Sequence, residues 1–277
     1  MATWNVHTLL CTEQTTQRRT AIVGHELERY GIDIAVLTES RFSENGSITE
    51  KSCGYTFYWS GLPKGERRIH GVCLAIRSDI AKRLQHLPRA VNERLITLRL
   101  PTTTHNRYMT IIGAYAPTMT YEDTIKEPFY NQLDQCIRET PKEDKLIIMG
   151  DFNARTGSDH EAWRGTLGPH GTGKCNRNDL ILLTKCMEHG LTLTNTYFKV
   201  PTKNKTTWMH PRSKKWHLID YIICRNRDLK DVLITKAVRG ANSETDHHMV
   251  LCKLKCNIQP PRPKLDQNQR RSLTLLA

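Results

Sequence analysis

Several polar residues stand directly at the ends of short apolar runs. Glu39 ends the run IAVLTE, and Asp151 and Asn153 end the run LIIMGDFN. Tyr115 closes IIGAY, and Asn5 stands in WNVH near the start of the chain. A carboxylate in such a place is costly to bury unpaired, so a cation or several donors must lie near it. Carboxylates and an amide that converge form the oxygen-rich site that Mg²⁺ prefers, with Mn²⁺ as an alternative.

A second group of residues suits phosphate chemistry. Asp220 lies within the apolar segment LIDYIIC, and Asp246 and His247 begin DHHMV. A neighbouring carboxylate orients an imidazole and favours its protonated form beside an anionic phosphate. Taken singly, Glu39 could be a helix cap or a salt-bridge partner, Asp220 a turn residue and His247 a core histidine. Their combination and order favour a hydrolytic centre, from which His248 is left out because it faces the opposite side of a strand.

Short strands and a few helices must position these residues. Runs rich in Val, Ile or Tyr predict strands over residues 32–39, 71–76, 94–100, 108–117, 145–152, 191–198, 218–225 and 248–256. Helical spacing of apolar residues predicts helices over 15–31, 125–139 and 178–190. This mixture predicts one α/β sandwich domain over residues 1–256.

Two segments differ from this pattern. Residues 154–177 are rich in glycine and polar residues, which predicts a long loop of a kind that often carries function. Residues 257–277 contain three prolines and scattered bases, which predicts a disordered tail.

The charge of the chain favours an anionic partner. The 277 residues include 41 Lys and Arg against 28 Asp and Glu, a formal net charge of +13. Nucleic acid is the leading candidate partner, and an ordinary basic soluble protein is the alternative. Bases in the loops near the motifs are the candidates for DNA contact: Arg155, Lys174, Arg177, Lys203 and Lys205.

The cysteines and the apolar runs bear on location. No run reaches the ~18 apolar residues of a membrane span, and no secretory signal is visible. The nine cysteines are odd in number and several lie in apolar runs, which predicts free thiols and no disulfide-linked partner. Cys252 and Cys256 lack a second pair at zinc spacing and are expected in the core. We expect an intracellular, nuclear protein with no membrane attachment.

Six blocks stand in an order typical of one protein family. They are WNVH, LTES, YAPT, GDFNAR, IDYI and TDHHMV, and they extend over about residues 3–256. In this order the chain resembles the endonuclease/exonuclease/phosphatase superfamily. TWNVHTL and GDFNARTG are similar in particular to the apurinic-type endonuclease domains of LINE-type retrotransposons. The resemblance implies a four-layer α/β (α+β) sandwich of two packed mixed β-sheets flanked by helices.

The resemblance also implies a metal site and an attacking water. Glu39 would be the principal Mg²⁺ ligand, with Asn5 beside it and Asp246 near the same ion. Asp151 would position or deprotonate the water that attacks the phosphate.

Further roles concern the phosphate and the DNA. The resemblance implies that Asn153 and His247 bind the scissile phosphate, with Asp220 orienting His247. Tyr115 would contact the phosphate through its hydroxyl, and Asn178 would touch the DNA backbone.

The chain departs from the DNA-repair members of the family at three places. His7 stands where those members carry an aspartate, so we expect weaker metal binding. His217 stands three residues before Asp220 and Trp216 is displaced by one position from the tryptophan of those members, so we expect no dedicated abasic-site pocket. The match begins at residue 3, so we expect a truncated copy with a poorly anchored first strand.

The function implied is a Mg²⁺-dependent DNA endonuclease derived from a LINE-type retrotransposon. It would nick one strand and leave 3′-hydroxyl and 5′-phosphate ends. A phosphatase or an exonuclease of the same fold is the first alternative, because fold does not fix substrate. A catalytically silent DNA- or chromatin-binding protein is the second, and it would keep DNA affinity without any Mg²⁺ dependence.

Overall fold

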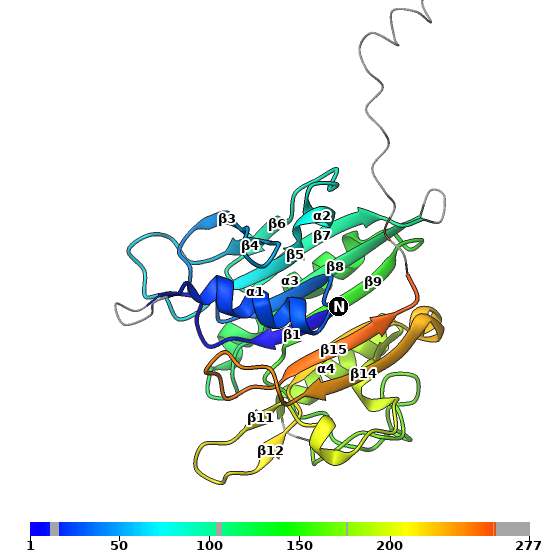
Figure 1. The fold of residues 1–277 in the computed structure, drawn as a ribbon. Coiled ribbons are helices and arrows are strands. Elements are labelled where there is room, and N and C mark those ends of the chain that lie inside the picture. Colours follow the sequence, from blue (N-terminus) through cyan, green and yellow to red (C-terminus); the bar gives the residue numbers. More distant parts are fainter. Residues whose placement is uncertain (12–16, 104–106, 176, 257, 259–277) are drawn as a thin grey trace, which may run out of the picture.

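Two β-sheets pack face to face in the computed structural model, with helices against both outer faces (Figure 1). The structure describes residues 1–11, 17–103, 107–175, 177–256 and 258, without the side chains of 177 and 178. Apart from Ile258, the tail 257–277 predicted to be disordered lies outside the described residues. The arrangement confirms the predicted four-layer sandwich.

Seven strands form the larger sheet. They are β1 (Ala2–Asn5), β2 (Ile34–Thr38), β3 (Asn45–Glu50), β4 (Tyr55–Ser60), β5 (Val72–Arg77), β14 (Val232–Val238) and β15 (Met249–Leu254). Their order is β14-β15-β1-β2-β5-β4-β3. Only β1 and β2 run parallel, so the sheet is mixed.

Six strands form the second sheet. They are β6 (Arg89–Asn92), β7 (Leu95–Pro101), β8 (Tyr108–Tyr115), β9 (Lys145–Asp151), β10 (Leu191–Leu193) and β13 (Asp220–Arg225). Their order is β10-β13-β9-β8-β7-β6, and β8 and β9 run parallel. A separate ribbon pairs β11 (Trp208–Met209) with β12 (Trp216–His217), and it projects from one end of the sandwich (Figure 1).

The helices cover the outer faces. They are α1 (Arg19–Arg29), α2 (Ser78–Ala81), α3 (Asp123–Glu139) and α4 (Arg177–Glu188). Three short 3₁₀ segments are η1 (Thr194–Thr196), η2 (Thr202–Asn204) and η3 (Asn226–Asp231). None of the described helices is long and apolar enough to cross a membrane.

Alternating side chains fill both sides of each sheet. In β2, Ile34 and Val36 belong to the core between the sheets, whereas Ala35 and Leu37 belong to the core beneath α1. Strand β9 alternates in the same way between the central core and the core beneath α3 and α4. Because a strand buried on both faces is apolar at every position, these strands appear in the sequence as continuous apolar runs.

Two sequence expectations are corrected by the fold. The first strand is well anchored, since all of β1 is buried between β15 and β2. The strand predicted over 191–198 ends at Leu193 and gives way to η1. There the Asn195 side chain accepts from the backbone N–H of Ile222 and donates to the carbonyl of Asp220, in place of continued strand pairing.

The cysteines agree with the sequence analysis. All nine are free in the described part of the chain. Cys252 lies in the core between the sheets, and Cys256 packs against it.

Candidate active site

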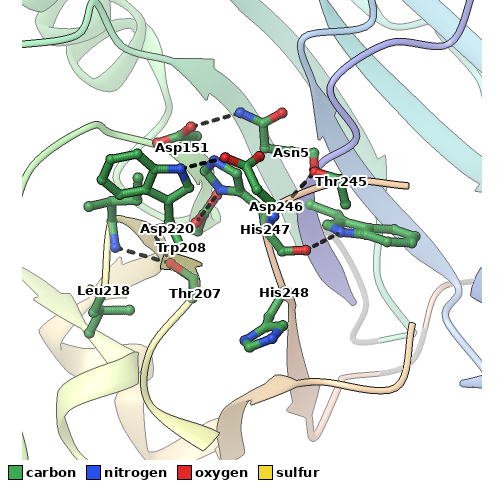
Figure 2. A network of polar contacts seen from close by, with 12 residues as sticks. Asn5, Asp151, Thr207, Trp208, Leu218, Asp220, Thr245, Asp246, His247 and His248 are labelled. Carbon is green, nitrogen blue, oxygen red and sulfur yellow. Dashed lines mark hydrogen bonds and ion pairs between the residues drawn. The ribbon is translucent and has the colours of Figure 1, made fainter. Parts of the chain in front are cut away.

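Strand ends from both sheets meet at one edge of the sandwich. Asp151 ends β9, where it pairs with Tyr115 of β8 and with Asp220 of β13. Asn5 ends β1 beside the end of parallel β2, directly before Glu39. The Asn5 amide Nδ2 donates to Asp151 Oδ2 over 3.0 Å, so one hydrogen bond joins the two sheets here (Figure 2).

Four polar groups surround the Glu39 carboxylate. Oε1 accepts from Asn5 Nδ2 at 2.8 Å and from the Tyr115 hydroxyl at 3.1 Å. Oε2 accepts from Arg41 Nη2 at 3.0 Å and lies 3.8 Å from His7 Nδ1. His7 therefore adjoins the carboxylate that is expected to bind the metal ion.

Asp151 and Asn153 form a tight turn after β9. The backbone N–H of Asn153 donates to Asp151 Oδ1 over 2.9 Å, and its side-chain amide donates to the carbonyl of Ala116 over 2.9 Å. The left-handed φ of Asn153, 48°, is tolerated best by Gly, Asn and Asp among common residues. Burial, and after it the Asp220 carboxylate, raises the pKa of Asp151 to about 7.

His247 and Asp220 form a buried pair beside Asp151. His247 Nδ1 lies 3.0 Å from Asp220 Oδ2 (Figure 2). Burial alone would lower the pKa of His247, but the charge and hydrogen bond of Asp220 raise it to about 9. The segment before β15 is fixed by Trp4, whose indole N–H donates to the carbonyl of His247. His247 is therefore an imidazolium at neutral pH.

The donor set of the site fits a divalent metal ion. Asp151, Asp220 and His247 bring side-chain polar atoms within 4.8 Å of one another, and the two carboxylates supply the oxygens, because both ring nitrogens of a protonated imidazole are donors. Asp220 Oδ1 is buried and has no hydrogen-bond partner among the described residues. Glu39 and Asn5 add oxygens at the same edge. Such an oxygen-rich set suits a hard cation, whose charge would stabilise the buried carboxylates.

Asp246 lies next to this pair and is exposed. Its Oδ2 accepts from Trp208 Nε1 over 2.8 Å (Figure 2). His248 is turned away from the site and stacks on Trp216, with ring centroids 4.1 Å apart.

A pocket of about 430 Å³ opens beside the site. It is lined by Thr118, Met119, Thr120, Asn153, Arg155, Trp208, His210, His217 and Ile219. Trp208 of the β11–β12 ribbon thus places an aromatic ring beside the site, whereas Trp216 stacks on His248. The sequence analysis missed Trp208 and Arg41. The one signal in the sequence for either residue was the position of Arg41, two residues after Glu39.

The bases proposed for DNA contact differ in their surroundings. Arg155 lines this pocket, and Lys174 and Lys203 are exposed. Lys205 donates to the carbonyl of His170 over 2.9 Å. Two further candidates begin α4, and their side chains lie outside the described residues: Arg177 and Asn178.

Sequence comparison relates the chain to known proteins. The Endonuclease/Exonuclease/phosphatase family matches residues 2–236. Craniofacial development protein 2 of Bos taurus is 30% identical over 259 residues, which cover 94% of this chain and 41% of the bovine protein. The chain therefore spans about two fifths of the length of the curated relatives that it matches.

Solved structures share the fold. The catalytic domain of Xenopus laevis APE2 has a TM-score of 0.63 and 16% identity, over 97% of this chain and 98% of that domain. The endonuclease domain of TRAS1, a telomere-specific non-LTR retrotransposon, has a TM-score of 0.58 and 15% identity, over 92% of this chain and 97% of that domain. The predicted family is confirmed: the chain belongs to the endonuclease/exonuclease/phosphatase family.

Proposed function

We propose that this chain is a Mg²⁺-dependent DNA endonuclease derived from a LINE-type retrotransposon, with a nuclear location. It nicks one strand and leaves 3′-hydroxyl and 5′-phosphate ends. The observation that carries the proposal is the convergence at one edge of Glu39, Asn5 and Asp151 with the His247–Asp220 pair. This set offers a base, a cation and oxygen ligands for phosphodiester hydrolysis.

In this proposal, one residue acts on the attacking water and others act on the phosphate. Asp151 accepts a proton from the attacking water, and a pKa of about 7 suits a general base at neutral pH. His247, held as an imidazolium, stabilises the charge that develops on the phosphate oxygens. Asn153 adds a donor to the same phosphate, and Tyr115 adds another when its hydroxyl turns from Glu39 to the phosphate. Mg²⁺ held by Glu39 and Asn5, with Asp246 nearby, would supply further positive charge.

The charge of the chain supports a DNA substrate. A net charge of +13 favours a long polyanion over a small phosphate ester. Arg155 beside the site and exposed Lys174 and Lys203 are suited to contact the DNA backbone.

One observation favours a catalytically silent DNA-binding protein. Arg41 forms an ion pair with Glu39 at 3.0 Å, and an arginine in this place competes with a metal ion for the carboxylate. If that pair persists in the presence of Mg²⁺, the chain binds DNA without cleaving it.

Nicking of supercoiled plasmid distinguishes these functions. Wild type, Asp151→Ala and His247→Ala are compared in Mg²⁺ and in EDTA, with His25→Ala as a matched control at a histidine of α1 whose side chain is 44% exposed. We expect Mg²⁺-dependent nicking by wild type and the control alone, and end-labelling then identifies the products. Nicking in EDTA, or by both site variants, contradicts the proposal. DNA binding without nicking by folded wild type supports the silent protein.

A further inference from the structure

A buried arginine connects two loops of the site. Arg19 begins α1 and is 8% exposed. Its Nε donates to the carbonyl of Thr8 over 2.9 Å. Its Nη2 donates to the carbonyl of Ser243 over 2.6 Å, and its Nη1 to Glu244 Oε2 over 2.9 Å. One guanidinium thus joins the loop after β1 to residues 239–248, the loop between β14 and β15.

Both loops adjoin or contain residues of the candidate site. The first begins directly after Asn5, and the second contains Asp246 and His247. Thr245 joins them at the site itself, since its hydroxyl donates to the carbonyl of Asn5 over 2.8 Å and accepts from the backbone N–H of His247. Arg19 binds Ser243 and Glu244, the two residues before Thr245, and therefore supports this junction between the two loops.

Among residues 239–246 of the second loop, only Ala241 packs against the apolar core beneath α1. A cavity of about 210 Å³ lies between α1 and the loop, and it is lined by Arg19, Ile22, Val23, Asn242, Ser243 and Glu244. The Ser243 hydroxyl is buried and has no hydrogen-bond partner among the described residues. Glu244 has a left-handed φ of 54°, which costs free energy in a residue other than glycine. A strained loop above a cavity depends on its polar contacts for its position.

Two other contacts from α1 reach this loop at exposed places. Glu26 accepts from the backbone N–H of Asn242 over 3.3 Å, and Arg29 donates to the carbonyl of Gly240. Arg19 differs from both because it is buried and reaches both loops. A cation at a helix N-terminus opposes the helix dipole, so the placement of Arg19 is not explained by the stability of α1.

We propose that Arg19 is a positioning residue that fixes Asp246 and His247 relative to Asn5. It touches neither the substrate nor the reacting atoms. Without it, the loop 239–248 opens more often and the site is complete for a smaller fraction of the time. The effect on loop opening is independent of the proposed function, whereas the effect on catalysis rests on it.

Hydrogen–deuterium exchange tests the effect on the loop, in EDTA and without DNA. Arg19→Met removes all three hydrogen bonds, and Arg18→Met removes the same charge from the neighbouring residue, whose side chain is 64% exposed. We expect amides within 242–248 to exchange at least about tenfold faster in Arg19→Met, because hydrogen bonds to charged groups are the stronger ones. Arg18→Met should exchange at the wild-type rate there. Wild-type exchange in folded Arg19→Met overturns the proposal.

Two milder variants serve if Arg19→Met does not fold. Arg19→Lys keeps the charge but places all its donors on one nitrogen, in place of the three guanidinium nitrogens that reach the two loops, and Glu244→Ala removes one acceptor from a side chain that is 81% exposed. We expect faster loop exchange in both, by a smaller factor than for Arg19→Met. Wild-type exchange in both overturns the proposal.

Nicking kinetics test the consequence for catalysis. If wild type nicks DNA, we expect kcat of Arg19→Met to fall about tenfold with an unchanged Kd for DNA, and more Mg²⁺ to be needed for half of the maximal rate. A merely destabilised protein would regain wild-type kcat on cooling, and that result overturns the positioning role. If wild type does not nick, the proposed function fails, and the exchange experiment still decides the role of Arg19.

Discussion

Replacing Asp220 by asparagine isolates the charge that keeps His247 protonated. The two side chains are 0% and 6% exposed and lie 3.0 Å apart. Burial lowers the pKa of His247, and the Asp220 carboxylate raises it from the ordinary 6.5 to about 9. The difference between these two pKa values of His247 corresponds to roughly 3 kcal/mol in favour of the imidazolium.

We expect Asp220→Asn to lower the pKa of His247 from about 9, because burial remains and the strongest of the charges that raise this pKa is gone, whereas Asp151 and Asp246 still raise it. The imidazolium is then less favoured in the variant than in wild type. The sign for stability follows from the raised pKa. His247 stabilises the native fold fully below 6.5, and that contribution is lost as the pH rises through about 9.

Histidine NMR across the neutral and alkaline range measures this pKa directly, with His247→Gln to assign the resonance. Asp246→Asn is the matched control, because this exposed carboxylate is the weakest of the charges acting on His247. We expect only a small decrease in the control. A His247 pKa that stays near 9 in Asp220→Asn refutes the assignment of Asp220 as its countercharge.

Three other substitutions test the site and the fold. Tyr115→Phe removes the hydroxyl bound to Glu39 and should lower kcat about tenfold with the fold intact; an unchanged kcat contradicts the role of that hydroxyl. Gly150→Ala would place a Cβ 1.7 Å from the carbonyl oxygen of Ala114, and should lower the free energy of unfolding in urea by about 3 kcal/mol. Leu133→Ala, at a position of α3 that is 3% exposed, should cost about 2–5 kcal/mol in the same assay and leave kcat unchanged. Wild-type stability of either variant contradicts the packing described for it.

The buried strands and the residues at their ends could be predicted from the sequence. β2, β8, β9 and β13 are buried on both faces, so their apolar runs are continuous and end where polar side chains begin. For this reason Asp151 and Glu39 could be recognised in the sequence as candidate site residues. The two residues meet because of the order of the strands in two sheets, and a single sequence does not contain that order. The expectation that they meet came from the family resemblance.

The edges of the fold and the supports of the site could not be predicted in this way. β3 has alternating exposed residues and β11 and β12 have two residues each, so none has a strong pattern. Trp208 reaches Asp246 only because the β11–β12 ribbon folds against the start of β15. Arg19 appears in the sequence as one base among many, and its acceptors lie up to 225 residues away.

The central claim is that side chains from separate strands act as one hydrolytic centre. Single-turnover cleavage of an end-labelled DNA duplex in Mg²⁺ tests it with wild type, Asp151→Asn, His247→Gln and the double variant. We expect each single substitution to lower the rate by ~10²–10³ and the double variant to lose far less than the product of the two losses, because residues that act as a unit are not additive. Losses that simply multiply, or a single variant that cleaves at the wild-type rate, would contradict a shared centre.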